Sequence, residues 1–162
     1  MSRLLVVHHA PTPSVEALLA SVLDGADDPL IEGVEVEARS ALDPDAETVL
    51  AADAIVLVTP ANFGYMSGAL KHFFDSIFLQ AGGALSDDGS ASDAGGRPRT
   101  PYGLLVHGRY DTTGAVRSVQ SIVQALPWVQ AAEVVEVLGD VDKAACHRAR
   151  ELGATLAALA SG

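Results

Sequence analysis

The sequence has little cysteine, few basic residues and no long apolar run. Its one cysteine, Cys146, cannot form an internal disulfide, and no cysteine cluster offers a zinc site. Ten Lys and Arg stand against 21 Asp and Glu, and the net charge of −11 repels nucleic acid phosphates and anionic lipids. No apolar run reaches the roughly 18 residues that a membrane span needs. We therefore expect no nucleic acid partner and no membrane partner.

The length of 162 residues is normal for one domain, and 49% of the residues are apolar, enough for a substantial core. We predict a single domain over residues 1–162. The apolar run Leu4–Val7 is too short for the core of a signal peptide, and no small-residue cleavage site follows it. This pattern indicates a buried first strand and predicts a cytoplasmic protein.

Five apolar runs alternate with one-sided apolar stripes of helical spacing. The runs, which predict strands, are Leu4–His8, Val34–Glu37, Ala54–Val58, Gly103–Val106 and Val134–Leu138. The stripes, which predict helices, cover residues 15–23, 66–78, 116–126 and 145–159, with a shorter helix at 44–51. Uninterrupted runs such as Ala54–Val58 are typical of parallel strands that helices cover on both faces. The sequence therefore predicts a three-layer, doubly wound α/β fold with a five-stranded parallel sheet in the flavodoxin-like order 2-1-3-4-5.

In this order, the loops after the first, third and fourth strands line the ligand crevice at the carboxyl ends of the strands. One acidic segment of small, polar residues, 82–96, interrupts the pattern and cannot bury enough apolar surface to order itself. We predict a flexible insertion over residues 82–100, between the third helix and the fourth strand. It is either a plain solvated insertion or a lid over the site.

The loop after the third strand, Thr59–Tyr65, carries the strongest functional signal. Its glycine, Gly64, permits a positive φ or a close backbone approach. Turn amides can meet the polar edge of a planar heterocycle, and aromatic rings beside them can stack on it. The alternative is a helix-initiating turn with an incidental aromatic residue. That alternative does not explain aromatic side chains at both Phe63 and Tyr65.

This loop resembles the flavin loop of the NAD(P)H-dependent FMN reductase and quinone oxidoreductase superfamily, in particular the tryptophan-repressor-binding-protein type. The matching residues are Thr59, Pro60, Phe63, Gly64, Met66, Phe74 and Asp75, while Tyr65 replaces the usual asparagine. The resemblance implies that residues 60–65 contact the isoalloxazine ring of FMN. It also implies a homodimer around the third helix, whose polar residues Lys71 and His72 otherwise form a solvated face.

The loop after the first strand is the candidate phosphate site, because a phosphate monoester binds amide and hydroxyl donors at a helix N-terminus. Thr12 and Ser14 offer hydroxyls, and the residues that follow Pro13 offer amides. The resembling family has a serine and a glycine at the positions of Ala10 and Pro13, so two donors are missing. The alternative is an ordinary Ser/Thr cap with proline at the helix start.

The loop after the fourth strand resembles the family's His-Gly-Gly-Gln-Glu-Thr loop beside the pyrimidine end of the flavin. Gly108 allows a close approach, and Arg109 or His107 can offset the negative charge that reduction builds near N1 of the ring. His107 is the candidate catalytic residue, as a proton donor to a quinone. Asp111 or Thr112 is expected to cap the following helix.

The predicted function is an FMN-binding oxidoreductase that passes electrons from NAD(P)H to a quinone or flavin acceptor. The predicted cofactor-binding residues are His9, Thr12, Ser14, Val15, Thr59, Pro60, Ala61, Asn62, Phe63, Gly64, Tyr65, His107, Gly108 and Arg109. No metal site is predicted, because the histidines lack a common helix-face spacing. The chain has no G-x-G-x-x-G after its first strand, no P-loop motif and no G-x-S-x-G motif, and it lacks the acidic residues of a receiver domain.

A non-enzymatic function is the alternative. Ala10 and Pro13 favour an electron carrier or binding protein with a weakened flavin site, whereas the well-matched residues 59–66 argue against a complete loss of flavin. A reductase oxidises NAD(P)H directly, and a carrier does not.

Overall fold

The computed structural model describes residues 1–88, 91–92 and 98–162. Its main sheet has the predicted order. The strands β2 (Val34–Ser40), β1 (Ser2–His8), β3 (Ala54–Asn62) and β7 (Thr100–Gly108) lie side by side and run parallel. Two short strands, β8 (Trp128–Gln130) and β9 (Val135–Leu138), share the fifth position, and both pair with β7 in parallel. The 2-1-3-4-5 order is confirmed, and in the last position the sequence pattern had missed the β8 half of the strand.

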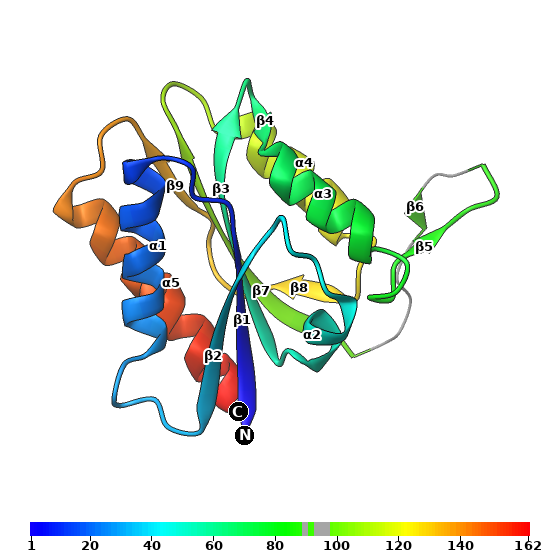
Figure 1. Cartoon of the computed structure of the whole chain (residues 1–162), viewed down its shortest axis with the longest axis horizontal. Helices are drawn as coiled ribbons and strands as arrows, with labels where there is room; N and C mark the ends of the chain where they lie inside the picture. The colour runs from blue at the N-terminus through cyan, green and yellow to red at the C-terminus, as the bar shows by residue number, and fades with distance from the viewer. Residues whose placement is uncertain (89–90, 93–97) are drawn as a thin grey trace.

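Helices cover the sheet on both faces, as the apolar runs predict (Figure 1). On one face lie α1 (Pro13–Ala26) and α5 (Lys143–Ser161), and on the other lie α2 (Ala46–Ala51), α3 (Gly68–Ile77) and α4 (Thr113–Val123). Successive side chains of a strand point to opposite faces. Leu4 and Val6 therefore pack under α1 and α5, while Leu5 and Val7 pack in the other layer.

The third helix begins two residues later than its apolar stripe predicts. Tyr65–Met66 turns back onto the end of β3 as a short antiparallel strand, β4. The helix α3 then begins after Ser67, whose Oγ accepts a hydrogen bond from the amide of Leu70 at 3.1 Å. The buried Thr59 fixes this start, because its Oγ1 accepts the amide of Ser67 at 3.1 Å.

The predicted insertion is described only in part. A short antiparallel pair, β5 (Ala84–Leu85) and β6 (Ala91–Ser92), lies within it. The flexibility predicted for residues 82–100 concerns in part residues 89–90 and 93–97, which lie outside the described residues. Among the helices of the described residues, none has the length and apolarity to cross a bilayer.

The helices α1 and α5 touch at their backbones. A Cβ atom at Gly153 would lie 1.9 Å from the carbonyl oxygen of Val22, and one at Gly25 would lie 1.9 Å from that of Arg150. Arg150 also pairs with Asp24 and, at 3.2 Å, with Asp28. Two glycines therefore set how closely the helical layer that covers β1 can pack.

We expect Gly153→Ala to destabilise the protein, although alanine is the better helix former. The new methyl group would force α1 and α5 apart, and overpacking of this kind costs about 1–3 kcal/mol. The measurement is the urea midpoint of unfolding. The matched control is Gly68→Ala in the first turn of α3, where a Cβ atom would meet nothing within 4 Å. A gain in stability at Gly153 would show that the two helices can separate freely.

Candidate functional site

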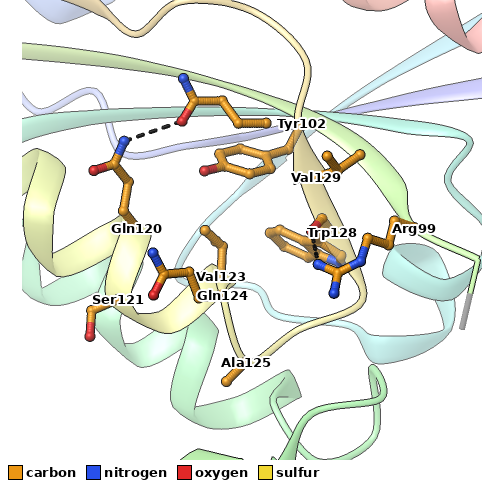
Figure 2. Close-up of a pocket in the computed structure, with 10 residues that line it drawn as sticks. Arg99, Tyr102, Gln120, Ser121, Val123, Gln124, Ala125, Trp128 and Val129 are labelled. Carbon is orange, nitrogen blue, oxygen red and sulfur yellow. Dashed lines mark hydrogen bonds between the residues drawn. The ribbon is translucent and has the colours of Figure 1, made fainter. Parts of the chain in front are cut away.

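The structure has open cavities at both ends of the sheet. The larger one, of about 710 Å³, lies at the amino end of β7, between α4 and β8 (Figure 2). Tyr102 and Trp128 form part of its wall, and Arg99 donates a hydrogen bond to the carbonyl oxygen of Trp128 at 3.3 Å. Burial raises the pKa of Tyr102. None of the predicted site residues lines this cavity, and open parallel sheets bind their ligands at the carboxyl end. We therefore place the candidate site at the carboxyl end.

The strand register brings the three predicted loops together at that end. His8 lies opposite Val58, and Pro60 lies opposite His107, so β1, β3 and β7 finish at one edge. Because each loop follows directly from a buried strand, the edge has a rigid base. The loops after β1, β3 and β7 thus form one surface, as the topology predicts.

The loop after β3 is a tight hairpin with a strained aromatic residue at its tip. Asn62 pairs with Tyr65, and the two residues between them have positive φ, 51° at Phe63 and 77° at Gly64. Two positive φ values are typical of a type I′ turn, which favours asparagine and glycine. A bulky residue in this conformation costs about 1–2 kcal/mol. The side chain of Phe63 is fully exposed, at 108%, so no packing in the fold repays that cost.

The hairpin is held against the loop after β7. Gly114, in the first turn of α4, lies so close that a Cβ atom would be 1.9 Å from the carbonyl oxygen of Gly64. A Cβ atom at Gly108 would lie 3.2 Å from Cβ of Ala61. These contacts fix the position of the hairpin, and the close neighbours of Gly108 are Thr112, Ala61 and Asp111 of the protein itself.

Asp111 supplies the capping hydrogen bond that was predicted for Asp111 or Thr112. The carboxylate of Asp111 accepts the amide of Thr113 at 2.9 Å, and this bond and the hydroxyl of Thr113 lower the pKa of Asp111. Thr112 is the residue at the N-cap position, but its hydroxyl donates instead to Glu136 at 2.7 Å. The loop is thus tied to both α4 and β9.

His107 bonds within the protein. Its Nε2 lies 2.7 Å from the carbonyl oxygen of Gly139, and the amide of Gly139 donates to the carbonyl oxygen of Gly108 at 2.8 Å. A carbonyl only accepts, so Nε2 carries the proton of this bond. His107 therefore holds the loop after β9, and this bond competes with its predicted role as a proton donor.

Arg109 is exposed and pairs with Asp140 at 3.2 Å. Hydrogen bonds to Asp140 and then to Tyr110 raise the pKa of Arg109, so its guanidinium stays charged. The carboxylate of Asp140 offsets part of that charge. Tyr110 itself is exposed, which adds a third aromatic ring to those of Phe63 and Tyr65 at this end of the sheet.

The loop after β1 begins α1 as an ordinary cap. Thr12 is the N-cap residue, and its Oγ1 accepts the amide of Val15 at 3.3 Å. The prediction that Val15 offers a free amide is therefore wrong, because the helix cap uses it. Pro11 and Pro13 have no N–H. The amides of Ala10, Thr12 and Ser14 remain as potential donors to an anion.

A cleft of about 440 Å³ lies beside this loop. The residues that line it are His8, His9, Ala10, Pro11, Glu16, Leu19 and Ser40. The Nδ1 atom of His9 is buried without a hydrogen-bond partner, and no other side-chain nitrogen or oxygen of the described residues is in that position. Burial, and then the neighbouring His9, lower the pKa of His8. Two imidazoles thus stand at the cleft beside the candidate phosphate loop.

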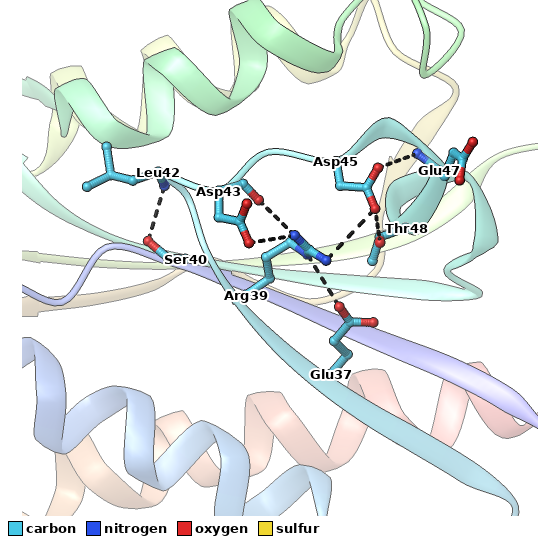
Figure 3. Close-up of polar contacts among 8 residues, drawn as sticks. All are labelled: Glu37, Arg39, Ser40, Leu42, Asp43, Asp45, Glu47 and Thr48. Atoms are coloured by element: carbon cyan, nitrogen blue, oxygen red, sulfur yellow. Dashed lines mark hydrogen bonds and ion pairs between the residues drawn. The ribbon is translucent and has the colours of Figure 1, made fainter.

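A cluster around Arg39, which sequence reasoning missed, holds the loop that contributes Ser40 to the cleft (Figure 3). Arg39 pairs with Glu37 at 3.3 Å, Asp43 at 2.7 Å and Asp45 at 3.8 Å. Asp45 also caps α2, and the Thr48 hydroxyl is the main cause of its lowered pKa. The only sequence signal was a single basic residue that lies among acidic ones, just after the predicted strand Val34–Glu37.

The residues at this edge fit FMN. The phosphate loop and cleft offer amide, hydroxyl and imidazole donors, including a ring whose buried nitrogen lacks a partner. The hairpin tip offers exposed aromatic rings at Phe63 and Tyr65 beside turn amides. This combination suits a planar heterocycle that carries a phosphate.

Comparisons with known proteins agree with this arrangement. A family model described as NADPH-dependent FMN reductase matches residues 6–141. A flavodoxin from Aquifex aeolicus is 31% identical over 77 residues, which is 48% of this chain and only 40% of that protein. A solved flavodoxin from the domain Archaea has a TM-score of 0.75 over 96% of both chains at 13% identity. A flavodoxin described as a WrbA-like protein from Agrobacterium tumefaciens has a TM-score of 0.70 over 99% of this chain and 98% of its own at 16% identity. These two structures show a flavodoxin-like fold.

The environment of His8 predicts that stability falls as the pH is lowered. The unfolded chain binds a proton at His8 near pH 6.5, whereas the lowered pKa keeps the folded residue neutral to a lower pH. Between these two values the unfolded state binds more protons, so acid favours unfolding. Between pH 7.5 and 5.5, we expect the urea midpoint of unfolding to decrease less in His8→Gln than in the unsubstituted protein. The control is His147→Gln, at an exposed site on α5. Equal pH slopes for His8→Gln and the unsubstituted protein would contradict this account.

Proposed function

Because the chain belongs to the NADPH-dependent FMN reductase family, we propose that it binds FMN at the carboxyl end of its sheet and passes electrons from NAD(P)H to a quinone or flavin acceptor. The observation that carries this proposal is the hairpin tip. Phe63 has a strained backbone and a fully exposed ring, and the fold gains nothing from either. Strain of this kind is typical of ligand-binding positions.

The proposed binding roles follow from the contacts of each loop. The rings of Phe63 and Tyr65 cover a face or an edge of the isoalloxazine and exclude water from it. Gly114 holds the hairpin in place for this task, because it lets α4 touch the carbonyl oxygen of Gly64. The phosphate is bound by the hydroxyls and amides of Thr12 and Ser14. When bound, FMN supplies the hydride and electron transfer chemistry itself.

The protein's remaining contribution is orientation. Hydride transfer needs the nicotinamide and the flavin held in a stacked, near-attack geometry. Tyr110 is exposed near the same edge and provides a surface for the second ring. The charge of Arg109, only partly offset by Asp140, stabilises negative charge in the pyrimidine end of a reduced ring. We assign His107 a positioning role, since its Nε2 proton is held by Gly139.

An electron carrier without reductase activity is the second candidate. Two observations favour it: Pro11 and Pro13 remove amides from the phosphate loop, and the proton of His107 is bonded within the protein. Direct oxidation of NAD(P)H by the FMN-loaded protein separates the two functions. A reductase consumes NAD(P)H in step with a quinone, whereas a carrier requires a separate reductase.

The homodimer implied by the family resemblance is part of this proposal. On α3, His72 and Asp75 are exposed, and Lys71 pairs with Asp75 at 2.7 Å along the same face. Tyr65 precedes this helix in the chain, and we propose that a second copy packed on α3 also contacts Tyr65. Residues of both copies would then line the site of the flavin ring.

Titration with FMN, followed by flavin fluorescence, tests the proposed function. We expect saturable quenching with FMN that is at least about tenfold tighter than with riboflavin, because hydrogen bonds to a charged group contribute about 1.5–3 kcal/mol. Equally weak affinities for FMN and riboflavin would show that the protein does not bind the phosphate. The absence of binding by either flavin would leave a flavodoxin-like scaffold with another function.

Replacing Phe63 tests two effects of this residue separately, its effect on stability and its effect on the affinity for FMN. We expect Phe63→Asn to stabilise the protein by about 1 kcal/mol, because asparagine tolerates the left-handed conformation. The same variant should bind FMN about tenfold more weakly, since a stacked aromatic contact contributes about 0.5–1.5 kcal/mol beyond its buried area. Phe63→Tyr is the control, which keeps the ring and should keep the affinity. If Phe63→Asn bound FMN with unchanged affinity, the hairpin tip would not contact the flavin.

A further inference from the structure

The phosphate loop is short of donors for the ligand that the proposed function requires. A phosphate monoester carries a charge of about −1.5 to −2 at pH 7. Two of the residues between β1 and the second turn of α1, Pro11 and Pro13, have no amide hydrogen, and the amide of Val15 is bonded to Thr12. Glu16 adds a negative charge in the first turn of the helix, and the whole chain carries −11. Other groups therefore have to join the remaining amides in binding the phosphate.

The adjoining cleft contains such groups. His8 and His9 both line it, with Glu16 from α1 and Ser40 from the end of β2. The backbone of this segment is fixed, because the amide of His9 donates to the carbonyl oxygen of Val58 at 3.0 Å, and the carbonyl of His8 accepts the amide of Ala41 at 2.8 Å. The two imidazoles are therefore anchored next to the loop that precedes α1.

The burial of His9 selects which ring nitrogen can serve a ligand. Its Nδ1 is buried without a partner, so a proton placed there would lack an acceptor. An unpaired buried donor costs the full desolvation of that group. Nε2 is therefore the ring nitrogen left to meet a ligand, and an anion, which only accepts, favours the tautomer with the proton on Nε2. Burial lowers the pKa of His8, and a phosphate dianion beside the ring would raise that pKa again.

We propose that the His8–His9 pair holds the phosphate of FMN, in place of the amides that Pro11 and Pro13 lack, and takes up a proton from solvent when the phosphate binds. The proton adds to a ring nitrogen of His8, because the second nitrogen of His9 is the buried Nδ1, and no bond to the phosphate is made or broken. The dianion supplies the negative charge that stabilises an imidazolium beside it, and Glu16 adds to that effect from the other side of the cleft. Ser40 is the neutral polar group that faces the pair from β2. This inference rests on the proposed binding of FMN.

Calorimetry of the unsubstituted protein tests the proton uptake directly. FMN is titrated at pH 7.0 in buffers of different ionisation enthalpy, and the slope of binding heat against that enthalpy gives the number of protons exchanged. We expect net uptake with FMN and none with riboflavin. The direction of proton exchange is decisive. The second pKa of a phosphate monoester is about 6, so binding of the dianion alone would release protons. Zero exchange or net release with FMN would overturn the inference.

The variant His8→Gln/His9→Gln tests whether the pair is the source of the uptake. We expect its affinity for FMN to fall about tenfold and its proton uptake to vanish, while riboflavin binds as before. His147→Gln, on the exposed face of α5, is the matched control and should change neither quantity. Urea unfolding of each variant confirms that it is folded.

The failure of this inference is distinguishable from the failure of the proposed function. FMN bound more tightly than riboflavin, with uptake unchanged in the double variant, would leave the function standing and assign the proton to another group. No binding of either flavin by the unsubstituted protein would overturn both.

Discussion

The burial of β1, β3 and β7 between two helical layers positions everything at the carboxyl end of the sheet. These strands are apolar on both faces, so a shift of register by one residue would move every side chain into the wrong layer. The register therefore fixes where His8, Pro60 and His107 lie at the carboxyl ends of their strands. The close contact of α1 with α5 holds one layer in place, and that contact depends on glycine.

The fold follows from patterns that are local in the sequence. Each buried strand is a continuous apolar run, and the alternation of runs with helical stripes leaves few possible topologies. Two short elements of the main sheet lacked such a signal. Tyr65–Met66 and Trp128–Gln130 are too short to show a period, and they become strands only because a neighbour offers an open edge. The start of α3 was placed too early for that reason.

The candidate site was predictable in its location and only partly in its bonding. The topology placed the three loops together, and the turn could be expected from Gly64, whereas the positive φ at Phe63 could not. The partners of individual polar atoms could not. His107 meets the carbonyl of Gly139, 32 positions away, and the amide of Val15 bonds to Thr12, which a residue list does not reveal. Distant contacts decide which donors remain for a ligand.

The hairpin tip has a consequence for how this family diverges. At position 63, the backbone favours glycine or asparagine and the solvent-exposed side chain has no role in the core. Without a binding requirement, nothing would oppose a change of the phenylalanine to asparagine or glycine, and either change would make the protein more stable. Under the proposed binding of FMN, an aromatic residue at this position serves the ligand at the expense of the fold. A paralogue that carried asparagine or glycine there would then have exchanged flavin binding for stability.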